Sequence, residues 1–178
     1  CYGGPDETTL ACGLSESSLR SMLLRRTSFQ LPTLDRCSAR SKRGMAVVFI
    51  DSNIPMYLIG APHPNKQLAE IVLRRLVNGE RTLVTDAEVF QEILHRYTAI
   101  RRHDAISPAF RLLEETVDTC VSITLDHVNR AKTLLESHPG LSARDAVHLA
   151  VMEAHEIVEV FSFDAGFDAV PTVKRIVG

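Results

Sequence analysis

Four acidic residues stand where the chain could build a catalytic site: Asp51, Glu92, Asp145 and Asp164. Asp51 and Asp164 follow apolar runs typical of buried strands, whereas Glu92 and Asp145 lie in predicted helices. Carboxylates just beyond the ends of parallel strands share one edge of an α/β sheet. Four of them together would repel one another unless a positive charge lay between them. One or two hard divalent cations would supply that charge, and phosphodiester hydrolysis is the chemistry they suggest.

The elements that must position these acids alternate between strand and helix from Met45 onward. The apolar patterns predict strands over residues 46–50, 82–85, 120–124, 159–163 and 172–176. Helical patterns cover about 53–59, 68–76, 87–97, 107–117, 126–136 and 142–155. This alternation predicts an α/β fold: an α/β/α sandwich around a central, mainly parallel sheet of four to five strands.

Bulk composition narrows the function classes. The chain has 178 residues, which favours one domain, and 45% of them are apolar. Its formal net charge of −2 gives no overall basic footprint, so any contact with nucleic acid must come from a local patch. No apolar run is long enough to cross a membrane, and no secretory signal is evident. Four cysteines without metal-site spacing favour a reducing, cytoplasmic compartment.

Residues 1–44 differ from the rest of the chain. They carry seven basic and four acidic residues with no clear hydrophobic period. We interpret them as a poorly structured leader, a tag or a mis-assigned start, and residues 45–178 as the domain. A second interpretation makes the segment a basic arm that touches RNA or a partner.

Helix capping offers a purely structural explanation for some of the acidic residues in this region. Thr85 and Glu88 have capping-box spacing, with Thr85 as the N-cap, which accounts for Glu88 without any chemistry. Glu92, one turn later, has no such explanation and is the preferred metal ligand. Ser142 and Asp145 repeat the same spacing, but a first-turn acid can also point into the crevice at the strand ends, so both roles remain open for Asp145.

Other polar residues could support the site. Asn53 lies two residues after the first acid, and Ser162 lies two residues before Asp164, on the same face of a strand. Asp168, one helical turn further on, is a lesser candidate ligand. His148 lies three residues after an acid, and we expect it to be packed rather than metal-bound.

The segments VVFIDSN (47–53), EIL (92–94), LSARDAVHLA (141–150) and FSFDAGFD (161–168) resemble the PIN-domain ribonucleases. The resemblance covers 45–178 and is greatest to the VapC toxins of type II toxin–antitoxin systems. It implies an acidic pocket that binds Mg²⁺ or Mn²⁺, cleavage of RNA, a homodimer and a cognate antitoxin. The implied catalytic and metal-binding residues are Asp51, Glu92, Asp145 and Asp164, with Asp168 as a possible helper and Asn53 and Ser162 in support. Ser52 departs from the threonine common in the family.

Several arginines could contact the RNA backbone: Arg96, Arg101, Arg102 and Arg144. Each could equally be a solvated surface charge. Two alternative functions remain. One is a non-catalytic PIN-like module that binds RNA or protein. The other is a haloacid-dehalogenase-type phosphatase, which would need Asp-x-Asp where this chain has Asn53 as the third residue.

Overall fold

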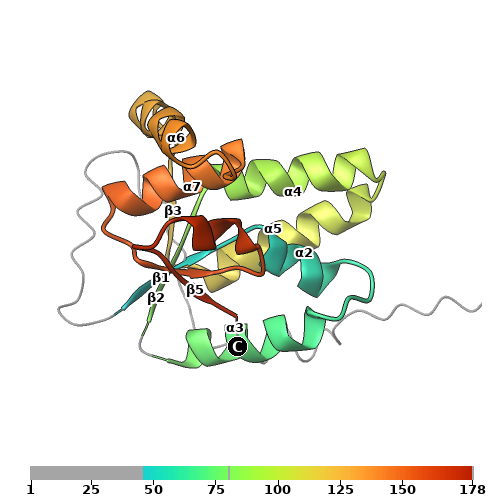
Figure 1. Ribbon diagram of the computed structural model, residues 1–178. Helices are drawn as coiled ribbons and strands as arrows, with labels where there is room; N and C mark the ends of the chain where they lie inside the picture. The colour runs from blue at the N-terminus through green and yellow to red at the C-terminus, as the bar shows by residue number, and fades with distance from the viewer. Residues whose placement is uncertain (1–45, 80, 178) are drawn as a thin grey trace, which may run out of the picture.

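The computed structural model describes residues 46–79 and 81–177, so the interpretation of the leader lies outside the described residues. Figure 1 shows a central sheet with helices on both sides of it. The strands are β1 (Val47–Ile50), β2 (Thr82–Asp86), β3 (Thr119–Val121), β4 (Glu159–Phe161) and β5 (Lys174–Ile176). The α-helices are α2 (Asn53–Ile59), α3 (Lys66–Asn78), α4 (Ala87–Ala99), α5 (Ile106–Thr116), α6 (Leu125–Ser137) and α7 (Ala143–Ala154). Two short 3₁₀ helices are η1 (His103–Ala105) and η2 (Ala165–Ala169).

The five strands are all parallel, in the order β3-β2-β1-β4-β5. From the central strand β1 the chain first builds outward through β2 and β3, and it later returns to place β4 and β5 on the other side. The order therefore reverses between β1 and β4, where Ile50 pairs with Phe161. The carboxyl ends of strands at such a reversal form a crevice, and ligands of open α/β sheets bind there.

The central strands are apolar because helices cover both faces of the sheet. Phe49 in β1 and Phe161 in β4 are fully buried. In Figure 1, α3 lies below the sheet, and α4, α6 and α7 lie above it. Helix α4 buries Val89, Ile93 and Tyr97, whose spacing of four residues places them on one face. Burial of each large apolar side chain stabilises the fold by about 1.5–3 kcal/mol.

Two of the expected strands end earlier in the structure than the sequence patterns indicate. Strand β3 ends at Val121 rather than residue 124, because Thr124 serves as the N-cap of α6. Strand β4 ends at Phe161 rather than residue 163, so Ser162 and Phe163 separate it from Asp164. No helix within the described part of the chain is long and apolar enough to cross a membrane.

Candidate active site

Asp51 lies at the carboxyl end of β1 and is almost completely buried, with 4% of its surface exposed. Its Oδ1 accepts a hydrogen bond from the Ser52 N–H at 2.6 Å. Its Oδ2 accepts from the Asn53 amide and from Ser162 Oγ, the latter at 2.6 Å. Three donors hold the carboxylate in one orientation, and Oδ1 keeps a lone pair for a further partner. Burial raises the pKa of Asp51 from its usual 3.8 to about 6, against the opposing effects of His148 and Ser162.

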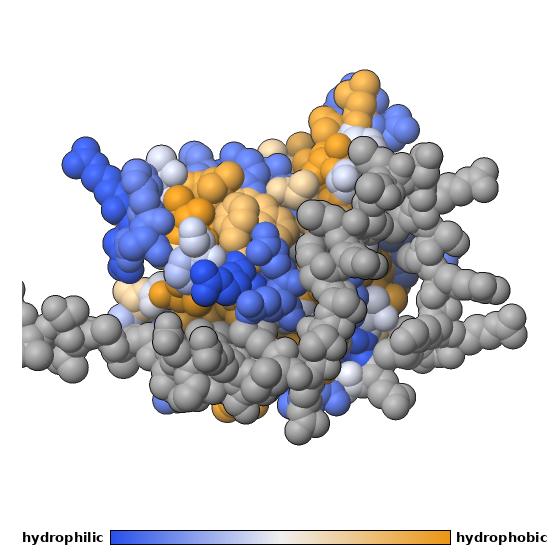
Figure 2. Space-filling model, turned by 180° about the vertical axis from the view of Figure 1, so that it is seen from behind, coloured by the Kyte–Doolittle hydropathy of each residue, from blue (hydrophilic) through white to orange (hydrophobic). Residues whose placement is uncertain are grey.

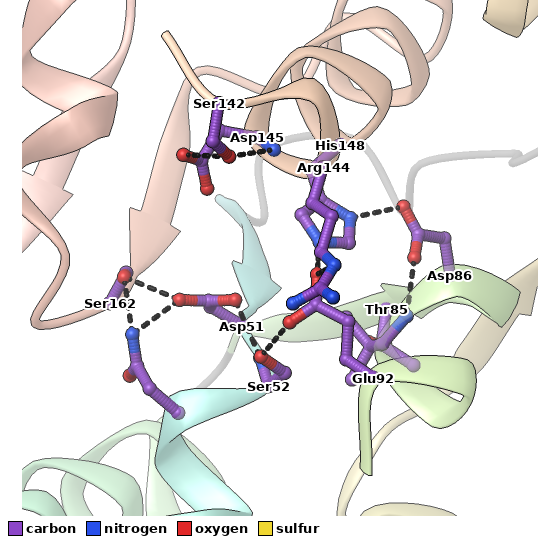
Figure 3. Close-up of polar contacts among 12 residues, drawn as sticks. Asp51, Ser52, Thr85, Asp86, Glu92, Ser142, Arg144, Asp145, His148 and Ser162 are labelled. Carbon is purple, nitrogen blue, oxygen red and sulfur yellow. Dashed lines mark hydrogen bonds and ion pairs between the residues drawn. The ribbon is translucent and has the colours of Figure 1, made fainter. Parts of the chain in front are cut away.

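Asn53 and Ser162 link the ends of β1 and β4. Besides donating to Asp51, Ser162 Oγ accepts from the Asn53 amide at 2.9 Å and from the Asp164 N–H at 2.9 Å. The side-chain oxygen of Asn53, Oδ1, accepts from the Phe163 N–H at 3.3 Å. Both side chains therefore orient Asp51 through direct hydrogen bonds, and Figure 3 shows Asp51 lying between Ser162 and Glu92.

Glu92, on the second turn of α4, is held by three neighbours. Its Oε2 accepts from Ser52 Oγ at 2.6 Å, and its Oε1 lies 3.2 Å from His148 Nε2 and 4.0 Å from Arg144 Nε. Burial would raise the pKa of Glu92, but the hydrogen bonds from His148 and Ser52 lower it overall. Glu92 is therefore an ionised carboxylate that is already partly neutralised.

His148 is fully buried between two carboxylates. Its Nδ1 lies 2.8 Å from Asp86 Oδ2, and its Nε2 faces Glu92 Oε1. Each ionised carboxylate can only accept a hydrogen bond, so both ring nitrogens must carry a proton. Burial alone would lower the pKa of His148, but the hydrogen bonds to Asp86 and Glu92 raise it well above its usual 6.5. His148 is thus a buried cation between β2, α4 and α7 (Figure 3).

Asp145 and Asp164 approach each other at Gly166. A Cβ atom on Gly166 would lie 3.0 Å from Asp145 Oδ2 and 3.2 Å from Asp164 Oδ1, so a larger residue there would push one of the carboxylates aside by a few tenths of an ångström. Asp164 Oδ1 also accepts from the Gly166 N–H at 2.8 Å. Burial raises the pKa of Asp145, and the charges of Asp164 and Glu92 raise it further, against the hydrogen bond from Ser142. Neither acid forms an ion pair within 4 Å in the described residues, although the charge of Arg175 acts on Asp164 and that of His148 acts on Asp145. Glu92 differs from them because it pairs directly with His148.

The remaining expected site residues lie apart from these acids or have other partners. Asp168 is exposed, and Arg175 holds both of its oxygens. Of the four candidate arginines only Arg144 lies beside a site acid. Arg96 is exposed near the end of α4, and Arg101 and Arg102 lie more than two helical turns beyond Glu92, with Arg102 paired to Asp104 at 2.8 Å.

The expected capping box at the start of α4 is wrong. The N-cap is Asp86, whose Oδ1 accepts from the Val89 N–H at 3.0 Å, because β2 runs one residue further than expected. The Thr85 hydroxyl instead donates to the Ile50 carbonyl at 2.9 Å and ties β2 to β1. At α7 the Ser142 hydroxyl accepts from the Asp145 N–H at 3.1 Å, as the sequence suggested.

Sequence reasoning missed Asp86 and gave His148 only a packing role. The signal for Asp86 was the one that found Asp51, an acid directly after an apolar strand. The signal for His148 was its position within Ala146-Val147-His148-Leu149-Ala150, because a histidine on a buried face needs hydrogen-bond partners.

The donor set suits a hard divalent cation. Asp51, Asp145 and Asp164 offer carboxylate oxygens, the ligands that Mg²⁺ prefers. The pKa values of Asp51 and Asp145 are raised mainly by burial and further by neighbouring carboxylates, and a bound cation would offset both effects. Among residues 46–79 and 81–177, no three acidic, histidine or cysteine side chains already stand close enough to enclose an ion. Binding would therefore draw these carboxylates together.

Replacing Asp86 by alanine should destabilise the protein by about 3–5 kcal/mol, because it leaves the buried His148 cation without one partner and uncaps α4. Urea denaturation followed by circular dichroism measures the loss. Glu88→Ala, two residues later, is the matched control and should change stability by less than about 0.5 kcal/mol. Equal losses in the two variants would contradict the assignment of Asp86 as cap and partner.

Comparison with known proteins gives a consistent family. The PIN domain family model matches residues 48–173. The chain is 49% identical over 130 residues to VapC ribonuclease Mb1869c of Mycobacterium bovis and equally to ribonuclease VapC13 of Mycobacterium tuberculosis, covering 73% of this chain and 99% of each relative. Ribonuclease VapC23 of M. tuberculosis is 33% identical over 118 residues, covering 66% of this chain and 93% of that protein.

Solved structures agree on the fold. M. tuberculosis VapC20, a sarcin–ricin loop cleaving toxin, superposes with a TM-score of 0.60 at 22% identity, covering 68% of this chain and 93% of that one. VapBC2 of Rickettsia felis, bound to a DNA fragment from its promoter, superposes with a TM-score of 0.57 at 15% identity. The match covers 73% of this chain and 97% of that one. The parallel sheet, the acids around its switch point and the extent of these matches lead to one conclusion: the chain belongs to the PIN-domain family and, within it, to the VapC ribonucleases.

Proposed function

We propose that this protein is a metal-dependent endoribonuclease that acts in the cytoplasm as the toxin of a toxin–antitoxin pair, hydrolysing RNA and so inhibiting translation and growth. The observation that carries the proposal is the placement of three carboxylates without a paired cation, those of Asp51, Asp145 and Asp164, around the switch point of the sheet. The proteins that are 49% identical to this chain are named ribonucleases, which supports RNA as the substrate.

Three of the acids share one part in the proposed reaction. Mg²⁺ or Mn²⁺ held by Asp51, Asp145 and Asp164 would activate water and stabilise the leaving oxygen of the phosphodiester. Ser162 and Asn53 keep Asp51 aimed into the crevice. Glu92 borders the crevice in ionised form, and His148 fixes its orientation from the buried side. Its role as a fourth metal ligand stays a prediction. Arg144, half-exposed beside Glu92, is placed to contact a phosphate.

Asp51→Asn or Asp145→Asn should reduce cleavage of single-stranded RNA by about a thousandfold or more, since metal ions supply several kcal/mol of transition-state stabilisation. Initial rates of RNA cleavage in Mn²⁺ buffer measure the effect. Asp168→Asn is the matched control and should stay within about threefold of the wild type, because Arg175 already occupies that carboxylate. Retained metal-dependent cleavage in Asp51→Asn or Asp145→Asn would refute the assignment.

Metal binding should weaken as the pH falls through about 6, because a proton then occupies the Asp51 carboxylate, whose pKa lies near that value. Without metal, the stability of the fold depends on pH in the opposite direction. A folded-state pKa above the unfolded 3.8 gives stability that is present below pH 4 and lost as the pH rises through about 6. The rise in melting temperature on adding Mn²⁺ should therefore be large at pH 7.5 and small at pH 5. An equal rise at both pH values would contradict this role for Asp51.

We propose further that the chain forms a homodimer and binds an antitoxin. Similar folds are described as a toxin–antitoxin complex from Klebsiella pneumoniae and as VapBC-1 from Haemophilus influenzae, with TM-scores of 0.53 for each. Leu125 and Val128 on α6 are 73% and 46% exposed, and Figure 2 shows apolar surface gathered towards this helix. Exposed apolar clusters of this kind often mark protein interfaces.

Light scattering of the purified chain should give a mass about twice 19.7 kDa, because the exposed apolar side chains would be covered by a second copy. Dilution into the nanomolar range tests whether that association is reversible. A mass of 19.7 kDa at micromolar concentration would contradict the homodimer.

A further inference from the structure

Four aromatic rings form a continuous series from the core to the surface beside the candidate active site. The ring centroids of Phe161 and Phe163 lie 5.9 Å apart, and those of Phe163 and Tyr57 lie 5.5 Å apart in an edge-to-face contact. Tyr57 and His63 are stacked, with centroids 4.2 Å apart and ring planes 16° from parallel. Phe161 is fully buried, Phe163 and Tyr57 are partly buried, and His63 is exposed. We call these four residues the aromatic ladder.

The ladder is fixed to the residues that hold Asp51. The Phe163 N–H donates to Oδ1 of the Asn53 side chain at 3.3 Å, and Nδ2 of the same side chain donates to Asp51. Tyr57 follows Asn53 by one turn of α2, so both lie on the same side of that helix. Phe163 also directly precedes Asp164. The ring of Phe163 therefore adjoins the residues of the crevice, and Tyr57 continues the series towards the exposed His63.

His63 is exposed, and one face of its ring stacks on Tyr57. Its Nδ1 accepts from the Asn65 N–H at 3.1 Å, which fixes the ring orientation. The exposed surface of His63 must therefore belong mainly to the open face and the Nε2 edge. A ring already held in place binds a planar partner with less loss of conformational entropy.

We propose that the open face of His63 stacks on an unpaired nucleobase of an RNA strand whose phosphodiester lies at the Asp51 crevice. The inference rests on the proposed ribonuclease function and adds a base-binding subsite to it. Aromatic and histidine rings bind unpaired bases by stacking, and proteins read single-stranded RNA in this way.

Base stacking can be separated from other roles of His63 by measuring the affinity of two protein variants for two kinds of RNA. The proteins are Asp51→Asn, used so that the RNA is not cut during the measurement, and Asp51→Asn with His63→Ala. The probe is a single-stranded RNA of about 12 nucleotides of mixed sequence, intact or carrying one abasic position that is moved along the strand. Fluorescence anisotropy in Mn²⁺ buffer gives each affinity.

The proposal predicts that His63→Ala weakens binding of the intact RNA about five- to a hundredfold, the range expected for one stacked base. On one abasic RNA the same substitution should have no effect, because the stacked base is already absent. His63→Phe should restore the affinity for intact RNA. His103→Ala, at an exposed histidine in η1, should leave it unchanged. Circular dichroism melting shows whether each variant is folded.

Three results would overturn the proposal. One is an unchanged affinity in His63→Ala, and another is an equal loss on every abasic RNA, which would indicate contact with the phosphates alone. A third is unchanged RNA binding combined with lost binding of a co-expressed protein partner, which would make the ladder a protein interface. Cleavage of the intact RNA by the wild-type chain, measured in parallel, shows separately whether the proposed ribonuclease function holds.

Discussion

The structure depends on keeping a carboxylate ionised where water is largely excluded. Asp51 stands at the point where the strand order reverses, and three hydrogen bonds replace the water it loses. The donors are Ser52 and Asn53 at the start of α2 and Ser162 just after β4, so the Asp51 side chain links these two segments. Burial still raises the pKa of Asp51, which means that the hydrogen bonds offset only part of the cost of removing the charge from water.

The acids divide into two groups with different electrostatic solutions. Asp86 and Glu92 share one buried cation, His148, which lies among β2, α4 and α7 and pairs with both of them. Asp51, Asp145 and Asp164 have hydrogen-bond donors but no paired cation in the described residues. The first group stabilises the frame around the crevice. The second group leaves an excess of negative charge in it, and that excess is what a divalent ion would bind.

Much of this arrangement follows from local sequence patterns. The buried strands were predictable because helices on both faces require unbroken apolar runs, and the placement of Asp51 follows from the end of such a run. Helix α2 was predicted at its observed bounds, because Pro55 is compatible with a first turn. The end of β4 was not predictable, because Ser162 and Phe163 leave the strand for contacts with Asn53 and Asp51, more than a hundred residues earlier.

The role of His148 was also hidden in the sequence, because it depends on residues far apart along the chain. Its three-residue spacing from Asp145 was visible in the sequence, but its partners Asp86 and Glu92 lie 62 and 56 residues away. Only the packing of α7 against α4 brings them together.

The central claim is that a cation completes the second group of acids, Asp51, Asp145 and Asp164. Anomalous diffraction from crystals soaked in Mn²⁺ tests it most directly. The account predicts a peak within coordination distance of Asp51 and of Asp145 or Asp164, about 2.0–2.4 Å from their oxygens. A Mn²⁺ ion bound elsewhere, with this crevice empty at saturating metal, would contradict it.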